Sequence, residues 1–351
     1  MKQELVRINS TDGIQMHGIL YTPDKTSKKI VIHVHGLNGN FYENNFLDSV
    51  SKSYTDKGFA FLTFNNRGRE FITELWKGKE CVVIGGSLER FKDCILDIEG
   101  VVNYAKEKGY KEIILIAQDT TKYGTDIYGE PKLAELLNKL SKIENIKWIR
   151  FLYAYPETID DELIKEVKEN EKVCKYFDIP IQHISNKVLK RMNRQSDGES
   201  IRKLIKKLRD QIPNVIIRTT VMVGFPGETN EDFEELYDFI KETKFDKLGA
   251  FSYSKEDGTP ASRLKEQIHP MTKKSRYNKI MKLQKEISKQ NEQQLLVREL
   301  EILIEDMSFD RKYYVGRSYM DVPEIDGVAY IKNNTDKNLI GQYIKAKVVE
   351  V

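Results

Sequence analysis

The first hundred residues alternate between short apolar runs and amphipathic helical patterns. IVIHVH (30–35) and FAFLTFN (59–65) are rich in β-branched and aromatic residues and are bounded by turn formers, which predicts buried strands. The segments 42–58 and 88–109 have helical spacing of apolar residues, and each ends at a glycine. Strands and helices in this order predict βαβ units with a parallel sheet.

The same alternation continues from residue 111 to about residue 270. Strand patterns appear in EIILI (112–116), KWIRFLY (147–153), DIPI (178–181), VIIRTTVMV (215–223) and KLGAFSY (247–253). Amphipathic helical patterns lie between them, and Thr229 with Asp232 predicts a capping box at the start of one helix. This repetition predicts part of a (β/α) barrel, whose chemistry would lie at the C-terminal ends of the strands.

The last eighty residues follow two further patterns. Residues 271–297 are charged and contain neither glycine nor proline, which predicts a connecting helix. Residues 298–351 alternate apolar and polar positions between Asp, Asn and Gly turns, which predicts a small all-β barrel. The expected fold class is therefore α/β with an all-β end, divided into 1–110, 111–270, 271–297 and 298–351.

Composition narrows the functional classes. The chain has 57 Lys and Arg against 54 Asp and Glu, a net charge of +3, so no global field favours nucleic acid. Residues 298–351 contain 8 Lys and Arg against 10 Asp and Glu, unlike a domain that binds a phosphate backbone. No apolar leader and no run of about 18 apolar residues is present, which predicts a cytoplasmic protein without a membrane partner.

Two strand ends in the first part resemble α/β-hydrolase motifs. His35-Gly36, followed by Leu37-Asn38-Gly39-Asn40, is similar to the loop whose backbone N–H groups stabilise a developing oxyanion. Asn65-Asn66-Arg67-Gly68 and the helix-to-strand segment GGSLERFKDCILDIEGVVNYAKEKGYKEIILI also resemble that family. The resemblance covers residues 1 to about 116 and implies the N-terminal part of an ester or amide hydrolase.

The nucleophile elbow of the hydrolases is replaced in this sequence. The family requires Gly-x-Ser-x-Gly after the strand that matches EIILI, because the serine must stand on a tight, strained turn. This chain has Ala117-Gln118-Asp119-Thr120-Thr121 instead, without the flanking glycines. Asp119 is a candidate nucleophile, with His35 and Gly36 as weak partners, and a working triad is not expected.

From residue 111 onward the sequence resembles the radical S-adenosylmethionine methylthiotransferases, most closely the RimO type. Six blocks in the family's order carry the resemblance: LIAQDTTKYG, KWIRFLYAYPETI, KVCKYFDIPIQHISNKVLKRMNR, IIRTTVMVGFPGETNEDFEEL, FDKLGAFSYSKEDGTPA and YVGRSYMDVPEIDGVAYIK. The resemblance implies a transferase that modifies an aspartate of a small-subunit ribosomal protein. It implies S-adenosylmethionine as cofactor and an OB-like TRAM domain at 298–351 that contacts the protein substrate, with nucleic acid met only in the ribosome.

The same resemblance implies which residues face the cofactor. Gly224 and Gly227 of GFPGE would give adenosine access to the backbone, and Glu228 or Thr229 would begin the following helix. Arg218 would pair with the carboxylate of the cofactor. The other candidates follow strand ends at the barrel mouth and are Asp119, Thr120, Gln182 and His183.

The family's [4Fe-4S] cluster requires three thiolates in a C-x-x-x-C-x-x-C loop. This sequence has Cys81, Cys94 and Cys174, which are 13 and 80 positions apart, so no metal ligands are expected and the chain is expected to be inactive in this form. Three alternatives stay open. The chain is a methylthiotransferase-type protein, an α/β-hydrolase-like esterase, or a non-catalytic module that binds S-adenosylmethionine or a ribosomal protein.

Overall fold

The computed structural model describes residues 1–351 except 25–26, 28, 37–38, 44–45, 324 and 336. The chain divides into two compact units. The first unit contains Met1–Ile113, Asp126–Gly129 and Asn138–Trp148, and the second contains Ile114–Thr125, Glu130–Leu137 and Ile149–Val351. The main division falls between Ile113 and Ile114, inside the strand at which the two sequence resemblances overlap.

The first unit is built on a mixed sheet with the strand order β1-β2-β4-β3. These strands are β1 (Lys2–Asn9), β2 (Gln15–Thr22), β3 (Ile30–Val34) and β4 (Ala60–Phe64). β3 and β4 are parallel, as predicted, and helix α1 (Phe46–Asp56) lies between them in the chain. β1 and β2 were not predicted; they are antiparallel and are joined by a tight turn in which Gly13 has φ 90°.

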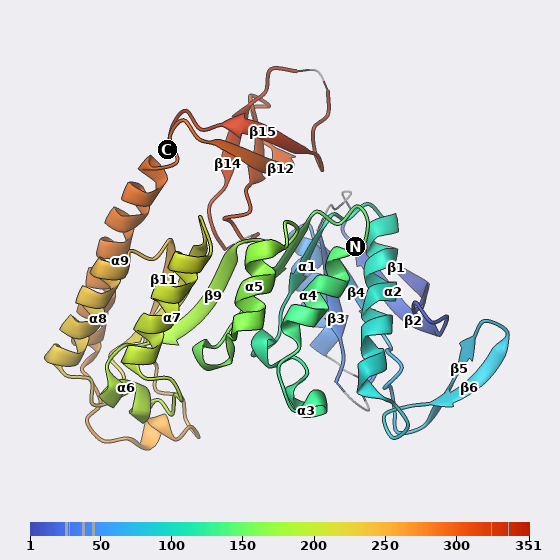
Figure 1. Cartoon of the computed structure of the whole chain (residues 1–351), viewed down its shortest axis with the longest axis horizontal. Helices are drawn as coiled ribbons and strands as arrows, with labels where there is room; N and C mark the ends of the chain where they lie inside the picture. The colour runs from blue at the N-terminus through green and yellow to red at the C-terminus, as the bar shows by residue number, and fades with distance from the viewer. Residues whose placement is uncertain (25–26, 28, 37–38, 44–45, 324, 336) are drawn as a thin grey trace. The chain divides into compact units, whose positions relative to one another are not determined.

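Helix α2 (Cys94–Glu107) follows the 3-10 turn η1 (Phe91–Asp93) and packs against β1. The contact is close because a Cβ on Gly100 would lie 2.3 Å from the backbone oxygen of Asn9. The helix ends, as predicted, at Gly109, whose φ is 90°. A hairpin of β5 (Thr73–Lys77) and β6 (Glu80–Ile84), which was not predicted, projects from this unit (Figure 1).

The strands of the second unit follow one another side by side. They are β7 (Glu112–Leu115), β8 (Trp148–Phe151), β9 (Tyr176–Gln182), β10 (Ile216–Val223) and β11 (Lys247–Ser252). β9, β10 and β11 are parallel, β7 pairs with β8, and Ile149 of β8 makes a parallel bridge to Val173 just before β9. This succession matches the partial (β/α) barrel that the sequence predicts.

Helices and 3-10 turns connect these strands. They are η2 (Thr120–Lys122), α3 (Thr125–Tyr128), α4 (Leu133–Ser141), η3 (Pro156–Thr158), α5 (Asp161–Glu169), α6 (Asn186–Arg191), α7 (Gly198–Gln211), α8 (Asn230–Thr243) and η4 (Ala261–Arg263). The amphipathic stripe of α7 is buried at Ile201, Ile205 and Leu208. The predicted capping box of Thr229 and Asp232 is present at the start of α8.

The predicted connector is part of the second unit's packed structure. It forms α9 (Pro270–Gln293), which packs against β11 and α8 (Figure 1). Ile280, Leu283 and Ile287 are buried on its inner face. Since the sequence between 271 and 297 is highly charged, this narrow apolar stripe was not recognised as a core contact.

The C-terminal segment folds into an antiparallel sheet with the order β14-β13-β12-β15. Its strands are β12 (Glu299–Met307), β13 (Tyr313–Arg317), β14 (Ala329–Lys332) and β15 (Tyr343–Lys347). Ile302, Ile304 and Tyr314 form the centre of its core, as the alternating pattern predicts. No helix in the described part of the chain combines the length and the hydrophobicity that a bilayer crossing requires.

Candidate functional site

Turns with unusual backbone conformations follow the parallel strands of the second unit. Tyr153 after β8 has φ 58°, and Gln182 at the end of β9 has φ 66°. Residues other than glycine rarely adopt positive φ, and such residues concentrate at functional sites. We call this edge of the sheet the mouth, and it consists of Asp119, Thr120, Tyr153, Gln182, His183 and the GFPGE turn (224–228).

A buried carboxylate fixes the GFPGE turn. Glu228 Oε2 accepts hydrogen bonds from the backbone N–H groups of Gly224 and Phe225. Glu228 Oε1 forms an ion pair with Arg276 of α9 at 2.8 Å. Burial raises the pKa of Glu228, although Arg276 and the two N–H groups oppose the shift. Glu228 therefore shapes the turn and does not present its carboxylate to solvent.

The turn requires glycine at both predicted positions. Gly224 and Gly227 have φ values of 73° and 84°. A Cβ on Gly224 would lie 2.4 Å from Lys273 Cγ, and one on Gly227 would lie 2.6 Å from Arg191 Cζ. The two glycines thus let long, flexible side chains of this chain pack against the backbone. Access of a ligand to Gly224 requires the Lys273 side chain to move.

Asp119 and Thr120 play different parts in the mouth. Thr120 is buried, and its hydroxyl donates to the backbone oxygen of Leu152 at 2.6 Å while its N–H donates to Tyr153 O at 3.1 Å. Thr120 therefore joins the end of β7 to the end of β8. Asp119 Oδ1 accepts from the Thr121 hydroxyl at 2.6 Å. Its Oδ2 lies 3.4 Å from Lys122 Nζ and accepts no hydrogen bond from the described residues.

His183 is a fully buried histidine with one unpaired ring nitrogen. Its Nδ1 accepts a hydrogen bond from the Ser185 N–H at 3.1 Å, so the neutral ring carries its proton on Nε2. Within the described residues, Nε2 has no hydrogen-bond partner. Burial lowers the pKa of His183 to about 4, so the ring is neutral near pH 7. The mouth therefore contains a neutral, buried N–H donor.

Arg218 is held by two carboxylates. Its Nη1 donates to Asp178 Oδ1 at 2.9 Å, and its Nε lies 3.8 Å from Asp326 Oδ1. Asp178 lies in the middle of β9, and Asp326 comes from the loop between β13 and β14. Pairing of Arg218 with a cofactor carboxylate stays a prediction, because its described contacts are with this chain's own aspartates.

The hydrolase-like candidates of the first unit take part in structural contacts. His35 Nδ1 lies 2.8 Å from the Gly36 backbone oxygen, and Nε2 accepts from the Asn66 N–H at 3.1 Å. Burial lowers the pKa of His35. Leu37 and Asn38 of the predicted oxyanion loop lie outside the described residues. Asp119 belongs to the second unit, whereas His35 and Gly36 belong to the first.

A buried ion-pair network fixes the turn after β4. Arg67 Nη2 lies 2.7 Å from Asp97 Oδ1 and 2.8 Å from Asp12 Oδ1, and its backbone N–H donates to Asp97 Oδ2 at 2.8 Å. Although burial disfavours the charged form, the hydrogen bonds of Asp97 raise the pKa of Arg67. Arg67 and Asp97 therefore join β4 to α2, and sequence reasoning recognised only the Asn-Asn-Arg-Gly motif.

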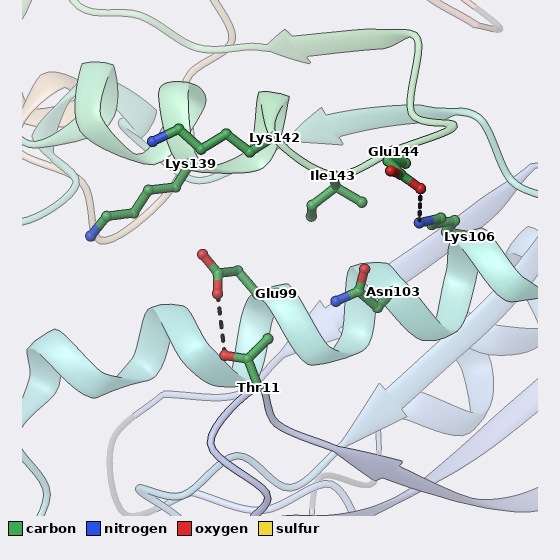
Figure 2. Close-up of a pocket in the computed structure, with 8 residues that line it drawn as sticks. All are labelled: Thr11, Glu99, Asn103, Lys106, Lys139, Lys142, Ile143 and Glu144. Carbon is green, nitrogen blue, oxygen red and sulfur yellow. Dashed lines mark hydrogen bonds and ion pairs between the residues drawn. The ribbon is translucent and has the colours of Figure 1, made fainter.

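A surface hollow of about 390 Å³ lies in the first unit, between α2 and the end of α4 (Figure 2). Its lining residues are Thr11, Glu99, Asn103, Lys106, Lys139, Lys142, Ile143 and Glu144. The Thr11 hydroxyl donates to Glu99 Oε2 at 3.2 Å, and Lys106 Nζ lies 3.9 Å from Glu144 Oε2 (Figure 2). None of the predicted site residues lines it. Its lining combines three lysines and two glutamates with Thr11, Asn103 and Ile143, and it contains an ion pair and a hydrogen bond at the surface.

Comparison with known proteins identifies the family. The family model of the radical SAM superfamily matches residues 62–240, and that of the TRAM domain matches residues 298–351. The chain belongs to the radical SAM superfamily. The superfamily match begins before residue 111, so it includes the last part of the segment that resembles a hydrolase.

Among the relatives of this radical SAM chain are proteins named ribosomal protein uS12 methylthiotransferase RimO. The protein from Alkaliphilus oremlandii is 62% identical over 246 residues, which cover 70% of this chain and 56% of that protein. The protein from Clostridium perfringens is 47% identical over 334 residues, which cover 92% of this chain and 72% of that protein. The resemblance to the RimO type is therefore confirmed, and the chain spans little more than half the length of the Alkaliphilus protein.

Solved structures are only distantly similar. Coproporphyrinogen III oxidase (HemN) from Escherichia coli, a radical SAM enzyme, has a TM-score of 0.43 and 18% identity, with coverage of 57% of this chain and 46% of that chain. The esterase Pf2001 of Pyrococcus furiosus has a TM-score of 0.30 and 14% identity, with coverage of 81% and 91%. Both TM-scores are too low to indicate a shared fold.

The radical SAM family implies S-adenosylmethionine and a [4Fe-4S] cluster. Cys81 is exposed and Cys94 half-buried in the first unit, whereas Cys174 is buried in the second. The Cys94 thiol donates to Glu89 Oε1 at 2.6 Å, and burial together with Glu89 raises its pKa, which disfavours the thiolate. These thiols do not fit the donor set of a cluster, whereas the polar atoms of the mouth fit a polar organic ligand.

Proposed function

We propose that this protein acts on the small-subunit ribosomal protein uS12 as a RimO-type protein. Its mouth would bind S-adenosylmethionine, and its TRAM domain would bind the ribosomal protein. The similarity to proteins named uS12 methylthiotransferase supports the partner. The single observation that supports the cofactor site is the mouth, where a buried N–H donor, a carboxylate oxygen and a glycine turn lie at the C-terminal ends of parallel strands.

Each mouth residue has a proposed part. Gly224 and Gly227 would offer their backbone to the adenosine once the Lys273 side chain has moved. Asp119 Oδ2 and His183 Nε2, which lack hydrogen-bond partners within the described residues, would bind polar groups of the ligand. Gln182 would also face the ligand. Thr120 and Glu228 would position these groups, because their polar atoms already hold the turns together.

The reaction needs a cluster in addition to these residues. Bound at three thiolates, a [4Fe-4S] cluster supplies the electron that cleaves S-adenosylmethionine in this family. The cysteines of this sequence are Cys81, which is exposed, Cys94, which is half-buried, and Cys174, which is buried. We therefore propose that this chain binds the cofactor and the ribosomal protein but does not methylthiolate by itself.

Calorimetry of the full chain with S-adenosylmethionine tests the binding. We expect saturable binding of one equivalent, weakened at least about tenfold by Glu228→Gln, because the neutral amide loosens the turn. Glu234→Gln is the matched control, since Glu234 is exposed on α8 with only a surface ion pair to Lys279. Absence of heat with the parent chain, or equal weakening by both variants, would contradict the cofactor site.

Reconstitution with iron and sulfide under anaerobic conditions tests the second half of the proposal. We expect less than one [4Fe-4S] cluster per chain and no methylthiolation of uS12. A full cluster with its visible absorption band would contradict the proposal and would assign the three cysteines as ligands.

The esterase alternative has its own test. Hydrolysis of a p-nitrophenyl ester that is lost in Asp119→Ala would support it. We expect no hydrolysis above buffer, because both nitrogens of His35 are engaged in structural contacts and neither is available as a general base.

A further inference from the structure

A segment of the TRAM domain contacts the inner residues of the barrel strands. We call the described residues 317–323 and 325–326, at the end of β13 and in the loop that leads to β14, the strap. Lys247 Nζ of β11 lies 2.9 Å from Asp321 Oδ1, and Arg150 Nη1 of β8 donates to the backbone oxygen of Tyr319 at 2.8 Å. The hydroxyl of Tyr176 in β9 donates to Asp326 Oδ2 at 2.7 Å. The strap therefore contacts the first residues of β9 and β11, Tyr176 and Lys247, and it contacts Arg150, the third of the four residues of β8.

The strap has polar contacts of its own. Asp321 Oδ2 accepts from the Ser318 hydroxyl at 2.9 Å, and its backbone oxygen accepts from Arg317 Nη1 at 3.2 Å. Asp326 Oδ2 also accepts from the Val322 N–H at 2.9 Å. The aspartates that reach the barrel, Asp321 and Asp326, are therefore also the ones that hold the strap together.

A continuous series of contacts leads from the strap to the mouth. Asp326 Oδ1 lies 3.8 Å from Arg218 Nε, and Arg218 Nη1 donates to Asp178 Oδ1 at 2.9 Å. The other oxygen of Asp178 accepts from the backbone N–H of Tyr153 at 3.3 Å. The backbone oxygen of Tyr153 in turn accepts from the Thr120 N–H at 3.1 Å. The series thus ends at the mouth residues after β8 and β7.

The charged side chains in this series of contacts are largely buried, so the series is sensitive to the loss of a single charge. The exposed fractions of the side chains are 1% for Asp178, 4% for Asp326 and 18% for Arg218. One guanidinium therefore balances two carboxylates away from water, where a charge change is poorly screened. Loss of the Asp326 charge removes one of the two groups that orient Arg218, so the guanidinium would hold Asp178 in its position less firmly.

The end of the series is a strained residue. Tyr153 has φ 58°, a conformation that a residue with a Cβ keeps only when its surroundings impose it. Its N–H and C=O groups are both held by hydrogen bonds, to Asp178 and from Thr120. Weakening the Asp178 contact therefore releases the Tyr153 backbone toward an ordinary conformation.

We propose that the strap sets the conformation of the mouth, with Arg218 as the positioning residue between them. Asp326 orients Arg218, Arg218 orients Asp178, and Asp178 holds the Tyr153 backbone. A protein partner that displaces the strap when it binds the TRAM domain would thereby loosen the mouth. This inference goes beyond the proposed function and stands whether or not S-adenosylmethionine binds, since it concerns contacts within the chain.

Hydrogen exchange of the full chain, resolved by residue, tests the link. In Asp326→Asn we expect the amides of Thr120, Tyr153 and Ala154 to exchange at least about tenfold faster than in the parent chain. The strands β12 and β13 should keep their protection. Asp310→Asn is the matched control, because Asp310 is exposed in the TRAM domain and its contacts with Ser308 and Lys312 are local. Unchanged mouth amides in Asp326→Asn would overturn the proposal, as would an equal loss of protection throughout the TRAM sheet.

A double-mutant cycle keeps the proposal testable if one variant is poorly stable. Asp178→Asn acts on Arg218 from the other side, so the exchange rate of Tyr153 in the double variant should be close to that in the faster single variant. Multiplication of the two separate effects would show that Asp326 and Asp178 act independently, and would overturn the role of Arg218. Both variants keep the size of the side chain, which limits changes in packing.

Discussion

The two units differ in how the polar side chains that follow their parallel strands are hydrogen-bonded. In the first unit, the side chains that fix the turns after β3 and β4 are paired: both nitrogens of His35 are engaged, and Arg67 is held by Asp97 and Asp12. Among the described residues of these turns, Arg69 Nε is buried without a hydrogen-bond partner. In the second unit, His183 Nε2 and Asp119 Oδ2 accept or donate no hydrogen bond within the described residues. Buried polar groups normally have hydrogen-bond partners, so these two atoms, one of which still lies 3.4 Å from Lys122 Nζ, are what the proposed ligand site of the second unit rests on.

The difference also shows how a buried arginine can be used. Arg67 and Arg218 are each held by two aspartates. The Arg67 contacts join a turn, a helix and the β1–β2 turn within the first unit, so they stabilise a fold. The Arg218 contacts join two barrel strands to a loop of the TRAM domain more than a hundred residues away. An arginine held by two aspartates therefore stabilises neighbouring elements in the first unit. In the second unit the same kind of ion pair connects the barrel to the TRAM domain.

The largest expected effect is the loss of the buried ion pairs of Arg67 in the first unit. Arg67→Ala leaves Asp97, whose side chain is 1% exposed, without its guanidinium partner. We expect the free energy of unfolding of this unit to fall by about 3–5 kcal/mol. Urea titration followed by hydrogen exchange, which separates the two units, measures it. Arg90→Ala, which removes an exposed pair with Asp93, is the control and should change stability by about 0–1 kcal/mol. An equal loss of stability in Arg67→Ala and Arg90→Ala would show that the buried ion pairs of Arg67 contribute no more than the exposed pair of Arg90.

The pH dependence of the second unit should reveal its unpaired histidine. The pKa of His183 is lowered by burial to about 4, against about 6.5 in an unfolded chain. The unfolded state therefore binds more protons between these values, so the histidine's contribution is complete above pH 6.5 and is lost as the pH falls toward 4. We expect a loss of about 3 kcal/mol over this window.

His183→Asn isolates that contribution, because the Asn side-chain oxygen can still accept from the Ser185 N–H. Urea titrations of the second unit at pH 7, 6 and 5 should show a shallower decline for the variant than for the parent chain. Parallel declines would mean that His183 is not a neutral buried group in the folded state. A ligand that accepts a hydrogen bond from His183 Nε2 should also raise the free energy of unfolding of the parent chain. It should leave that of the His183→Asn variant unchanged.

Sequence patterns predicted the second unit better than the first. The strands β7 to β11, the capping box of Thr229 and the buried stripe of α7 were all recognised, because local signals and tertiary packing agree there. The β1–β2 pair and the β5–β6 hairpin were missed: β1 and β5 contain several charged residues, and the apolar run of β2 is only its second half, ILYT. The charged segment of α9 concealed a core contact for the same reason.

The site residues were found by resemblance, and their roles required coordinates. Glu228 or Thr229 was expected at the start of a helix; Thr229 is the N-cap of α8, and the Glu228 side chain closes the preceding turn together with Arg276 of α9. Arg218 was expected to face a cofactor, and it contacts Asp178 and Asp326. These partners are 40 to 108 positions away in the chain, and no spacing rule connects them. Long-range ion pairs of this kind are therefore invisible to local patterns.

A smaller effect is expected at the turn of the second unit. Glu228→Gln keeps an oxygen for the backbone N–H groups of Gly224 and Phe225 but leaves buried Arg276 with a neutral partner. We expect the free energy of unfolding to fall by about 1–3 kcal/mol. Chemical denaturation at pH 7 measures it. A change below that of the exposed control Glu234→Gln would show that the turn does not depend on the carboxylate charge.

The smallest effect compares the helix starts of the two units. The hydroxyl of Thr229 accepts from the Asp232 N–H at the start of α8, whereas Asp93 at the start of α2 makes no side-chain cap. Thr229→Ala should therefore lower stability by about 1 kcal/mol, and Asp93→Ala should change it by only a few tenths of that amount. Thermal unfolding of the two variants side by side is the measurement. If Asp93→Ala were the more damaging, its pair with Arg90 would have to stabilise the first unit more than an exposed pair normally does. Surface ion pairs would then stabilise the first unit in addition to its buried pairs. The two units would differ in their surface contacts as well as in their buried ones.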